Sequence, residues 1–249
     1  MQRLDKLLTS RGLCSRREVQ KMIASGAVTE IEGRPLKPDT KVEAEKIRVN
    51  GRPLEGELIY ILLNKPENTV CSHEDRGSLV YELLPERFCR RSGGISCVGR
   101  LDKDTTGVLL ITDDGALNHR LLSPKRHVRK VYEVWTQEPV SQEQAELFRA
   151  GGLYLEGDPK PLAAAEVRLL GDGEPCGEAE AAEEPELSCH LLLTLTEGRY
   201  HQVKRMLEAV GNKVLRLHRR SFAGLGAGSL RPGQWRLLDD EEVLKLKGL

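Results

Sequence analysis

The sequence predicts an α+β protein with a small first domain, residues 1–55, and a larger second domain, residues 57–249. Three observations predict it. Apolar residues recur at helical spacing over residues 3–24, and short extended pieces broken by turns follow over residues 28–55. Longer apolar runs, typical of strands, then alternate with helical patterns to the end of the chain.

The first domain is expected to contain two short helices. Leu4, Leu7 and Leu8 form the apolar face of the first helix, which ends before Gly12. A capping-box pattern, Ser15-Arg16-Arg17-Glu18, opens the second helix. Three extended pieces are expected after it, at Val28-Thr29, Glu32-Gly33-Arg34 and Ile47-Arg48-Val49.

Basic residues gather at the start of the second helix. Arg16 and Arg17 are expected in its first turn, where the helix dipole disfavours cations, and Arg11 and Lys21 lie close by. Cations in an unfavourable place suggest a partner that compensates, and phosphate is the obvious one. A solvated basic face is the equally simple alternative.

The formal net charge of zero conceals an uneven distribution. Residues 1–55 hold 12 basic against 8 acidic side chains, and residues 187–249 hold 11 against 6. Residues 171–186 hold seven acidic side chains and no basic one, with two prolines and three glycines. This stretch predicts a mobile surface loop between two strands. The two basic segments, which lie at the two ends of the chain, indicate a nucleic-acid partner.

The cysteines and the N-terminus narrow the protein class. Six cysteines occur without C-x-x-C spacing or a histidine cluster, so neither a zinc site nor a disulfide framework is expected. The charged N-terminus does not resemble a secretion signal, and no apolar run reaches the ~20 residues that cross a bilayer. No phosphate-binding loop or G-x-G-x-x-G motif is present. We therefore expect a cytoplasmic monomer without metal, cofactor or membrane association.

The second domain follows a hinge at residues 50–57. An apolar strand, Leu58 to Leu63, runs into Asn64-Lys65-Pro66, where proline ends it. The other predicted elements are a strand from Val108 to Ile111, a helix with Leu117, Leu121 and Leu122 on its apolar face, a strand in which Val128, Lys130, Tyr132 and Val134 share one face, a strand from Leu191 to Thr196, and a helix that buries Val203, Met206, Leu207 and Val210.

Asp102 is the leading candidate for a catalytic group. It lies in a polar turn directly before the strand at 108–111, so its carboxylate is held in place and partly screened from water. Arg100, two residues away, can face the same site. From local chemistry alone, a turn whose Asp and Thr side chains bond their own backbone is the commoner alternative.

The run Gly99-Arg100-Leu101-Asp102-Lys103-Asp104-Thr105-Thr106-Gly107 resembles the G-R-L-D-x-x-T-T-G signature of the pseudouridine synthases of the RsuA and Rlu families. Three other segments resemble further motifs of that family: Asn64-Lys65-Pro66, the K-x-Y-x-V run at 130–134, and the run at 197–207 that contains Gly198-Arg199-Tyr200-His201-Gln202-Val203-Lys204. Residues 1–50 resemble the S-four-type RNA-binding domain of a ribosomal small-subunit protein.

The resemblance implies a fold and a set of site residues. The second domain should have a mixed, mostly antiparallel central sheet flanked by helices. Asp102 would be the essential catalytic residue, Lys204 would pair with it, and Tyr132 would stack on the target base. The expected RNA contacts are Arg100, Arg199 (which supports either the site or the RNA), Lys130, Arg11, Arg16, Arg17 and Lys21. His201 is expected to have a structural role.

The implied reaction breaks the N1–C1′ bond of uridine, turns the base and rejoins it through C5. A single carboxylate is reasonable because the detached base is kept and reused, whereas glycosidases normally need two. A cation beside a buried carboxylate favours its ionised form, so an Asp102–Lys204 ion pair is expected. The implied substrate is small-subunit (16S) ribosomal RNA, either naked or within a partly assembled small subunit. The alternatives are a large-subunit rRNA pseudouridine synthase and a non-catalytic RNA-binding ribosome-assembly factor.

Overall fold

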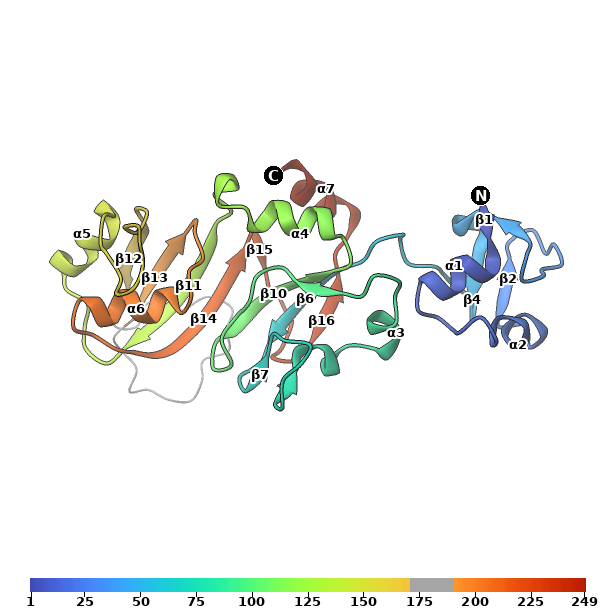
Figure 1. The fold of residues 1–249 in the computed structure, drawn as a ribbon, viewed down its shortest axis with the longest axis horizontal. Helices are drawn as coiled ribbons and strands as arrows, with labels where there is room; N and C mark the ends of the chain where they lie inside the picture. Colours follow the sequence, from blue (N-terminus) through green and yellow to red (C-terminus); the bar gives the residue numbers. More distant parts are fainter. Residues whose placement is uncertain (171–189) are drawn as a thin grey trace.

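The computed structural model describes residues 1–170 and 190–249, which form an elongated molecule with the N-terminal unit at one end (Figure 1). The surface loop expected at 171–186 lies outside the described residues. The N-terminal unit contains α1 (Leu4–Ser10), α2 (Val19–Ala24), the strand pair β1 (Gln2–Arg3) and β3 (Lys41–Val42), and a sheet of β2 (Val28–Glu30), β4 (Ile47–Val49) and β5 (Arg52–Pro53).

The helical spacing predicted for the first 24 residues is confirmed, because Leu4, Leu7 and Leu8 are fully buried in the core of this unit. Two expectations were wrong. Residues 32–34 form no strand; Gly33 takes a left-handed backbone in the turn that follows β2. Arg16 and Arg17 lie in a turn before α2, which begins only at Val19.

The rest of the chain is built on a nine-stranded sheet. As predicted, the sheet is mixed and mostly antiparallel; its one parallel pair within the described ranges joins β10 to β14. The main strands, in spatial order, are β12 (Glu166–Leu170), β13 (His190–Leu195), β11 (Lys130–Thr136), β14 (Val214–Phe222), β10 (Thr106–Thr112), β6 (Tyr60–Lys65) and β16 (Trp235–Leu237). The short strands β9 (Ser96–Cys97) and β15 (Leu225–Gly226) pair with β10 and β14.

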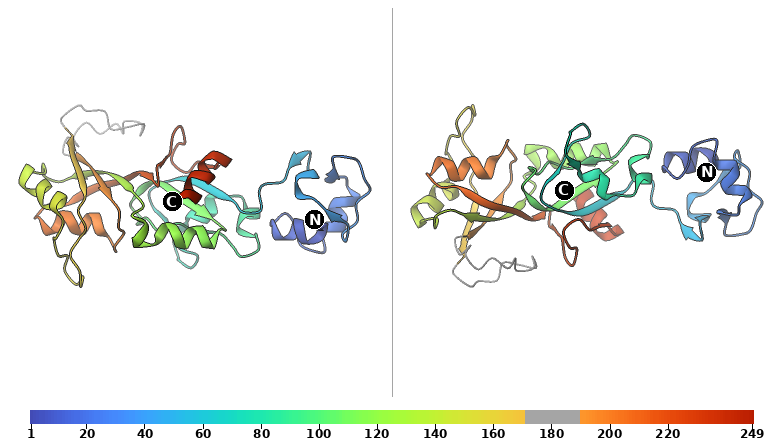
Figure 2. Two further views of the ribbon diagram at one scale, coloured as in Figure 1. Left: turned by 90° about the horizontal axis from the view of Figure 1, so that it is seen from above. Right: turned by 90° about the horizontal axis from the view of Figure 1, so that it is seen from below.

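Two groups of helices cover the two halves of this sheet (Figure 2). On the β12–β13–β11–β14 half, α5 (Gln142–Ala150) and α6 (Gln202–Ala209) enclose one apolar core. On the β10–β6–β16 half, α4 (Gly115–Leu122) and α7 (Asp240–Gly248) cover one face, and α3 (Glu86–Cys89) contributes to the core on the other. The strands β7 (Thr69–Val70) and β8 (Ser78–Leu79) form a separate small pair.

The continuous apolar run of β6 follows from this arrangement. Ile61 and Leu63 face the core beside α3, whereas Tyr60 and Leu62 face the core beneath α4 and α7. A strand covered on both faces carries apolar residues at every position rather than at alternate ones. The observed strand has the six residues predicted for 58–63 but begins two residues later, at Tyr60, and ends at Lys65.

Gly107 makes the central parallel pairing possible. It has φ +103° and lies opposite Arg219 in the β10–β14 register. A Cβ atom at this position would come within 2.3 Å of the Arg219 carbonyl oxygen. Only glycine combines this backbone conformation with so close an approach, which explains the glycine that ends the T-T-G run.

Buried arginines tie the N-terminal unit to the rest of the molecule. Arg11 is 6 % exposed and donates to the backbone carbonyls of Glu55 and Gly56. Arg91 donates to the backbone carbonyl of Glu57 at 2.5 Å and is held in place by the buried carboxylate of Asp113 at 2.7 Å. The neighbouring amide of Ser92 donates to the carbonyl of Ser10 in the N-terminal unit at 3.0 Å. Arg11 is thus occupied at the junction between the two parts. Because Arg11 is almost fully buried and bound to backbone carbonyls, we do not include it among the residues proposed below to contact RNA.

Across the described part of the chain, no helix has both the length and the apolar character needed to cross a membrane.

Candidate active site

A pocket of about 540 Å³ opens where the two halves of the large sheet meet. Its walls come from the turn before β10, from β11 and β14, and from the segment that leads into α6. The sequence-predicted residues that line it are Arg100, Asp102, Lys130, Tyr132, Arg199 and His201. Segments that are far apart in the sequence therefore meet at one cavity.

The turn that carries Asp102 is fixed by a buried lysine. Lys65, at the end of β6, is 0 % exposed, and its ammonium donates to the carbonyl of Thr105 at 2.7 Å and to that of Lys103 at 3.2 Å. The amide of Thr105 donates to the carbonyl of Asp102 at 3.1 Å, which closes the turn. Burial lowers the pKa of Lys65. Lys65 of the Asn-Lys-Pro run thus fixes the backbone of the Asp102 turn through these hydrogen bonds.

The side chains of Lys204 and His201 face the Asp102 carboxylate. Nζ of Lys204, in α6, lies 3.5 Å from Oδ2 of Asp102, so the predicted ion pair is present. Nε2 of His201 lies 3.3 Å from Oδ1. His201 directly precedes α6 in a left-handed conformation, φ +46°, and the ring of Tyr200 stacks on it at 3.8 Å. The structure therefore places His201 at the carboxylate itself.

Asp104 competes for the same lysine. The Lys204 ammonium lies 2.7 and 2.8 Å from the two carboxylate oxygens of Asp104. Burial acts to lower the pKa of Lys204, but the hydrogen bond and charge of Asp104, with the charge of Asp102, outweigh it and raise that pKa. Burial likewise acts to raise the pKa of Asp104, and Lys204 more than compensates and lowers it. Lys204 is therefore a firmly protonated cation shared by two acids.

Tyr132 and Lys130 line the same pocket as Asp102. Both belong to β11 and, being two residues apart, share one face of the strand, as predicted. Burial, reinforced by the nearby Arg219, lowers the pKa of Lys130 to about 8. Lys130 is thus a pocket lysine whose charge changes near neutral pH, rather than a surface residue on the approach to the site.

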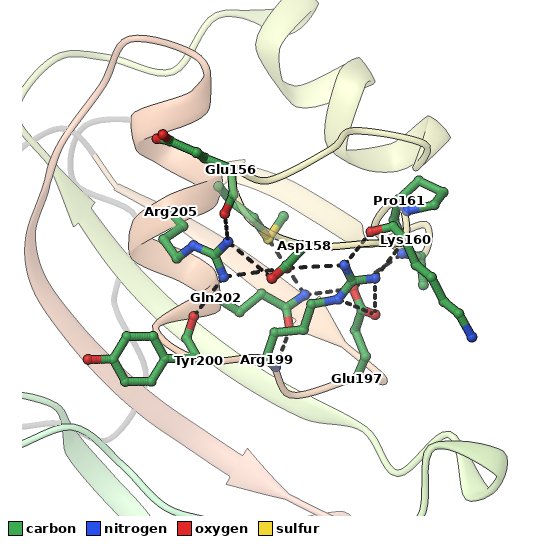
Figure 3. A network of polar contacts seen from close by, with 11 residues as sticks. Glu156, Asp158, Lys160, Pro161, Glu197, Arg199, Tyr200, Gln202 and Arg205 are labelled. Atoms are coloured by element: carbon green, nitrogen blue, oxygen red, sulfur yellow. Dashed lines mark hydrogen bonds and ion pairs between the residues drawn. The ribbon is translucent and has the colours of Figure 1, made fainter.

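Arg199 has no free donor for RNA in this structure (Figure 3). Its guanidinium donates to the carboxylates of Glu197 and Asp158, and Arg205 donates to Asp158 as well. The remaining donors of Arg199 reach the backbone carbonyls of Lys160 and Pro161. All five N–H groups thus have protein acceptors. Of the two roles expected for Arg199, this geometry favours support of the loop before α6.

The other expected RNA contacts fall into two places. Arg100 is exposed at the pocket. Arg16 and Arg17 are exposed in the N-terminal unit, where Lys21 follows in α2, and none of these three lines the pocket. Among the residues the structure places, no group of His, Cys, Asp and Glu side chains is arranged to hold a metal ion.

Comparison with known proteins identifies the family. Residues 59–209 match the family model described as RNA pseudouridylate synthase, and residues 2–47 match the S4 domain. The chain belongs to the RNA pseudouridylate synthase family. Its fold is similar to that of a crystal structure of pseudouridylate synthase, with a TM-score of 0.64 and 32 % identity, over 99 % of this chain and 100 % of that one.

Two relatives of this family illustrate how far the similarity extends. An uncharacterized RNA pseudouridine synthase, YtzG, from Bacillus subtilis is 40 % identical and aligns over 97 % of this chain and 96 % of its own. Ribosomal small subunit pseudouridine synthase A from Vibrio vulnificus is 39 % identical, and 97 % of each chain is covered. This pseudouridylate synthase is thus aligned with its relatives over nearly its whole length.

Several residues in or beside the pocket of this pseudouridylate synthase were not assigned a role from the sequence. Asp104 follows Asp102 by two residues, and that spacing of two acids was a signal that could have been used. Cys71 and Arg219 line the pocket and carry no local signal, because each reaches it from a strand or turn whose neighbours are distant in sequence. Lys65 lies in the Asn-Lys-Pro run that the sequence singled out, but its hydrogen bonds to the Asp102 turn were not expected. The Cys71 thiol has its pKa lowered by a hydrogen bond from Cys97 and, further, by the charges of Lys65 and Arg219.

Proposed function

We propose that this enzyme converts uridine to pseudouridine in small-subunit ribosomal RNA. The observation that carries the proposal is the Asp102 carboxylate, held between Lys204 and His201 at a pocket that Tyr132 also lines. The relatives named ribosomal small subunit pseudouridine synthase A, 34–39 % identical over almost the whole chain in several bacteria, support the choice of RNA. Residues 57–249 would be the catalytic domain and residues 1–55 an RNA-binding domain.

Asp102 starts the reaction in this proposal. The bond between N1 and C1′ breaks, and its electron pair leaves with the uracil. The Asp102 carboxylate either adds to C1′ or removes the proton at C2′, and both courses require its ionised form. Lys204 lies 3.5 Å from one oxygen of Asp102 and does not cover both, since its shorter contacts are to Asp104.

Tyr132 holds the target base. A stacked uridine has to be turned out of the RNA before it can reach this pocket, at a cost of a few kcal/mol. Stacking on an aromatic ring stabilises the turned-out base by about 1–3 kcal/mol, which offsets part of this cost. After the base turns, C5 bonds to C1′ as the bond from Asp102 to C1′ breaks, or as the proton held by Asp102 returns to C2′. C5 then loses a proton and N1 gains one, and we assign Tyr132 to relay it.

The RNA backbone is bound by exposed cations. Arg100 would hold the strand at the pocket or fill the space that the turned-out base leaves. Arg16, Arg17 and Lys21 would contact phosphates farther along the RNA, from the first domain. Naked rRNA and a partly assembled small subunit both offer such phosphates, and the enzyme would act as a monomer.

The decisive experiment compares wild-type enzyme with Asp102→Asn on transcribed small-subunit rRNA. The variant keeps the size of the side chain and removes its charge, so pseudouridine formation should fall by more than about 1,000-fold while RNA affinity stays within a few fold. Chemical mapping of pseudouridine and filter binding measure the two quantities. An active Asp102→Asn enzyme would disprove the catalytic assignment.

The substrate is tested by the same mapping. Wild-type enzyme is incubated separately with small-subunit rRNA, large-subunit rRNA and small-subunit particles at different stages of assembly. Pseudouridine only in large-subunit rRNA would contradict the proposed substrate. Tight RNA binding without pseudouridine in any sample would instead support a ribosome-assembly factor.

A further inference from the structure

Arg219 is a buried cation at the candidate active site that the sequence-based hypothesis does not use. It lies in β14, is 1 % exposed, and lines the pocket. In the antiparallel register Arg219 pairs with Tyr132 of β11, so the two side chains project from the same face of the sheet. Arg219 therefore reaches the cavity from beside the ring that we expect to stack on the target base.

Most of the hydrogen-bonding capacity of Arg219 is unused. Its Nε donates to the carbonyl of Val108 at 2.8 Å, and this is its one hydrogen bond to the described part of the chain. Nη2 is fully buried without a partner among those residues. A guanidinium carries five N–H donors, so four remain for a ligand in the cavity that Arg219 lines. Burying unpaired donors is unfavourable, which indicates a missing acceptor.

No carboxylate neutralises Arg219 within the described residues. Arg219 forms no ion pair there, and its charge instead acts on Lys130 and on the thiols of Cys71 and Cys97. Three acids line the pocket: Asp102 is paired with Lys204, Glu197 is paired with Arg199, and Asp75 is exposed. Arg219 and Lys130 thus leave positive charge on the wall of the pocket, and the burial of Arg219 strengthens its interaction with an anion that enters.

The geometry of Arg219 suits a planar anion. The Nε bond to Val108 and the Phe222 ring, whose centroid lies 5.1 Å from the guanidinium carbon, hold the group in one orientation. A guanidinium fixed in this way offers a rigid fork of donors to an oxygen and a nitrogen of a ring. An ammonium on a flexible stem presents no such fork.

If the proposed function holds, the reaction itself generates the required anion. When the N1–C1′ bond breaks, its electron pair stays on the uracil and spreads from N1 to O2 and O4. When C5 then bonds to C1′, Asp102 leaves C1′ or returns the proton to C2′, the C5 proton passes to a base, and N1 takes up a proton. We propose that Arg219 contacts the uracil of the target nucleotide and stabilises the anion that departs from C1′, which makes it a catalytic residue.

The test uses a leaving group that needs less stabilisation. Small-subunit rRNA is transcribed with UTP or with 5-fluoro-UTP, because fluorine at C5 stabilises the uracil anion. Single-turnover formation of the C5–C1′ bonded nucleoside is followed by nuclease digestion and mass spectrometry. Arg219→Lys should lower the rate about 100-fold on uridine and less than about 10-fold on 5-fluorouridine, with the Kd for RNA changed by no more than about 3-fold.

Arg220→Lys is the matched control, since Arg220 is the next residue of β14 and is exposed. It should leave both rates unchanged. Thermal unfolding checks each variant, and if Arg219→Lys is unfolded, Arg219→Gln, which keeps an N–H and removes the charge, replaces it. Equal losses on the two substrates indicate a structural role and overturn the inference, as does an unchanged rate on uridine. Wild-type enzyme that is inactive on both transcripts overturns the proposed function and this inference together.

Discussion

Nζ of Lys204 lies 2.7 Å from Oδ1 of Asp104, closer than its 3.5 Å approach to Oδ2 of Asp102. One lysine therefore serves two acids that are separated by a single residue. Asp104 is the more exposed of the two, and it keeps Lys204 protonated without occupying the pocket. This arrangement leaves one oxygen of Asp102 free of a short contact to Lys204, which a carboxylate that must react requires.

Replacing Lys204 should damage catalysis more than replacing Asp104. Lys204→Met removes the cation that both acids share, and we expect the single-turnover rate to fall on the order of 100-fold. Asp104→Asn should cost less than about 5-fold, because Lys204 can then move toward Asp102. Lys204→Arg should restore most of the activity lost in Lys204→Met. Equal losses for Lys204→Met and Asp104→Asn would show that Asp104 is itself required.

RNA affinity should fall above pH 8. The pKa of Lys130 is lowered to about 8, so its positive charge disappears as the pH rises through that value. If this charge attracts RNA, the Kd should rise a few fold between pH 7 and pH 9, measured by fluorescence anisotropy at constant ionic strength. Lys130→Arg keeps its charge and should show a flat profile. The same rise in the variant would assign the effect to another group.

The same lysine predicts an opposite trend in stability. The pKa of Lys130 is lower in the folded state than the ordinary 10.5 of an unfolded chain. Between pH 8 and pH 10.5 the unfolded state therefore binds more protons, and the Lys130 contribution to the free energy of unfolding increases as the pH rises. Urea unfolding at pH 7, 8 and 9 should show this contribution in the wild type, and Lys130→Met should lack it.

Gly107→Ala should unfold much of the second domain. Its Cβ would lie 2.3 Å from the Arg219 carbonyl, on a residue with φ +103°. We expect the free energy of unfolding to fall by roughly 3 kcal/mol or more. Gly228→Ala is the control, because Gly228 also has a positive φ but would have no atom within 4 Å of the new Cβ. It should cost about 1 kcal/mol. Similar losses would contradict the close approach of β10 and β14.

Removing the exposed arginines of the first domain should weaken RNA binding and its salt dependence. The double variant Arg16→Gln, Arg17→Gln would lose two phosphate contacts, which should reduce the slope of log K against log salt by about 1.5. Lys245→Gln, Lys247→Gln changes the total charge equally at the C-terminal helix and should leave the slope unchanged. An identical slope in the arginine variant would remove these residues from the interface.

Local pattern predicted the regular elements well and the site only in part. The apolar runs of β6 and β10 and the stripe of α6 are set by burial, which leaves a periodic signal in the chain. The turn of Asp102 gave no such signal, and its catalytic assignment depended on the resemblance to a family. Its pairing with Lys204 was expected from the same source.

The positions of Arg11, Arg219 and Lys65 were not foreseen, and each has a physical reason. Arg11 was grouped with Arg16 and Arg17 by charge, but its side chain is folded inward to the carbonyls at the junction, which no local pattern indicates. Arg219 and Lys65 gained their positions through strand pairing with residues more than 40 positions away. Strand register is decided by the whole sheet, so a single sequence does not reveal which polar side chains will share a cavity.

Tyr132 packs against the apolar cores of both halves of the large sheet. Any change that loosens or tightens one half is therefore transmitted to the ring that faces the pocket. Efforts to make this enzyme more heat-resistant by refilling either interior should be monitored by turnover as well as by melting temperature. A substitution of Leu193 in one core or of Leu63 in the other is expected to shift the Tyr132 ring, although neither leucine lines the pocket.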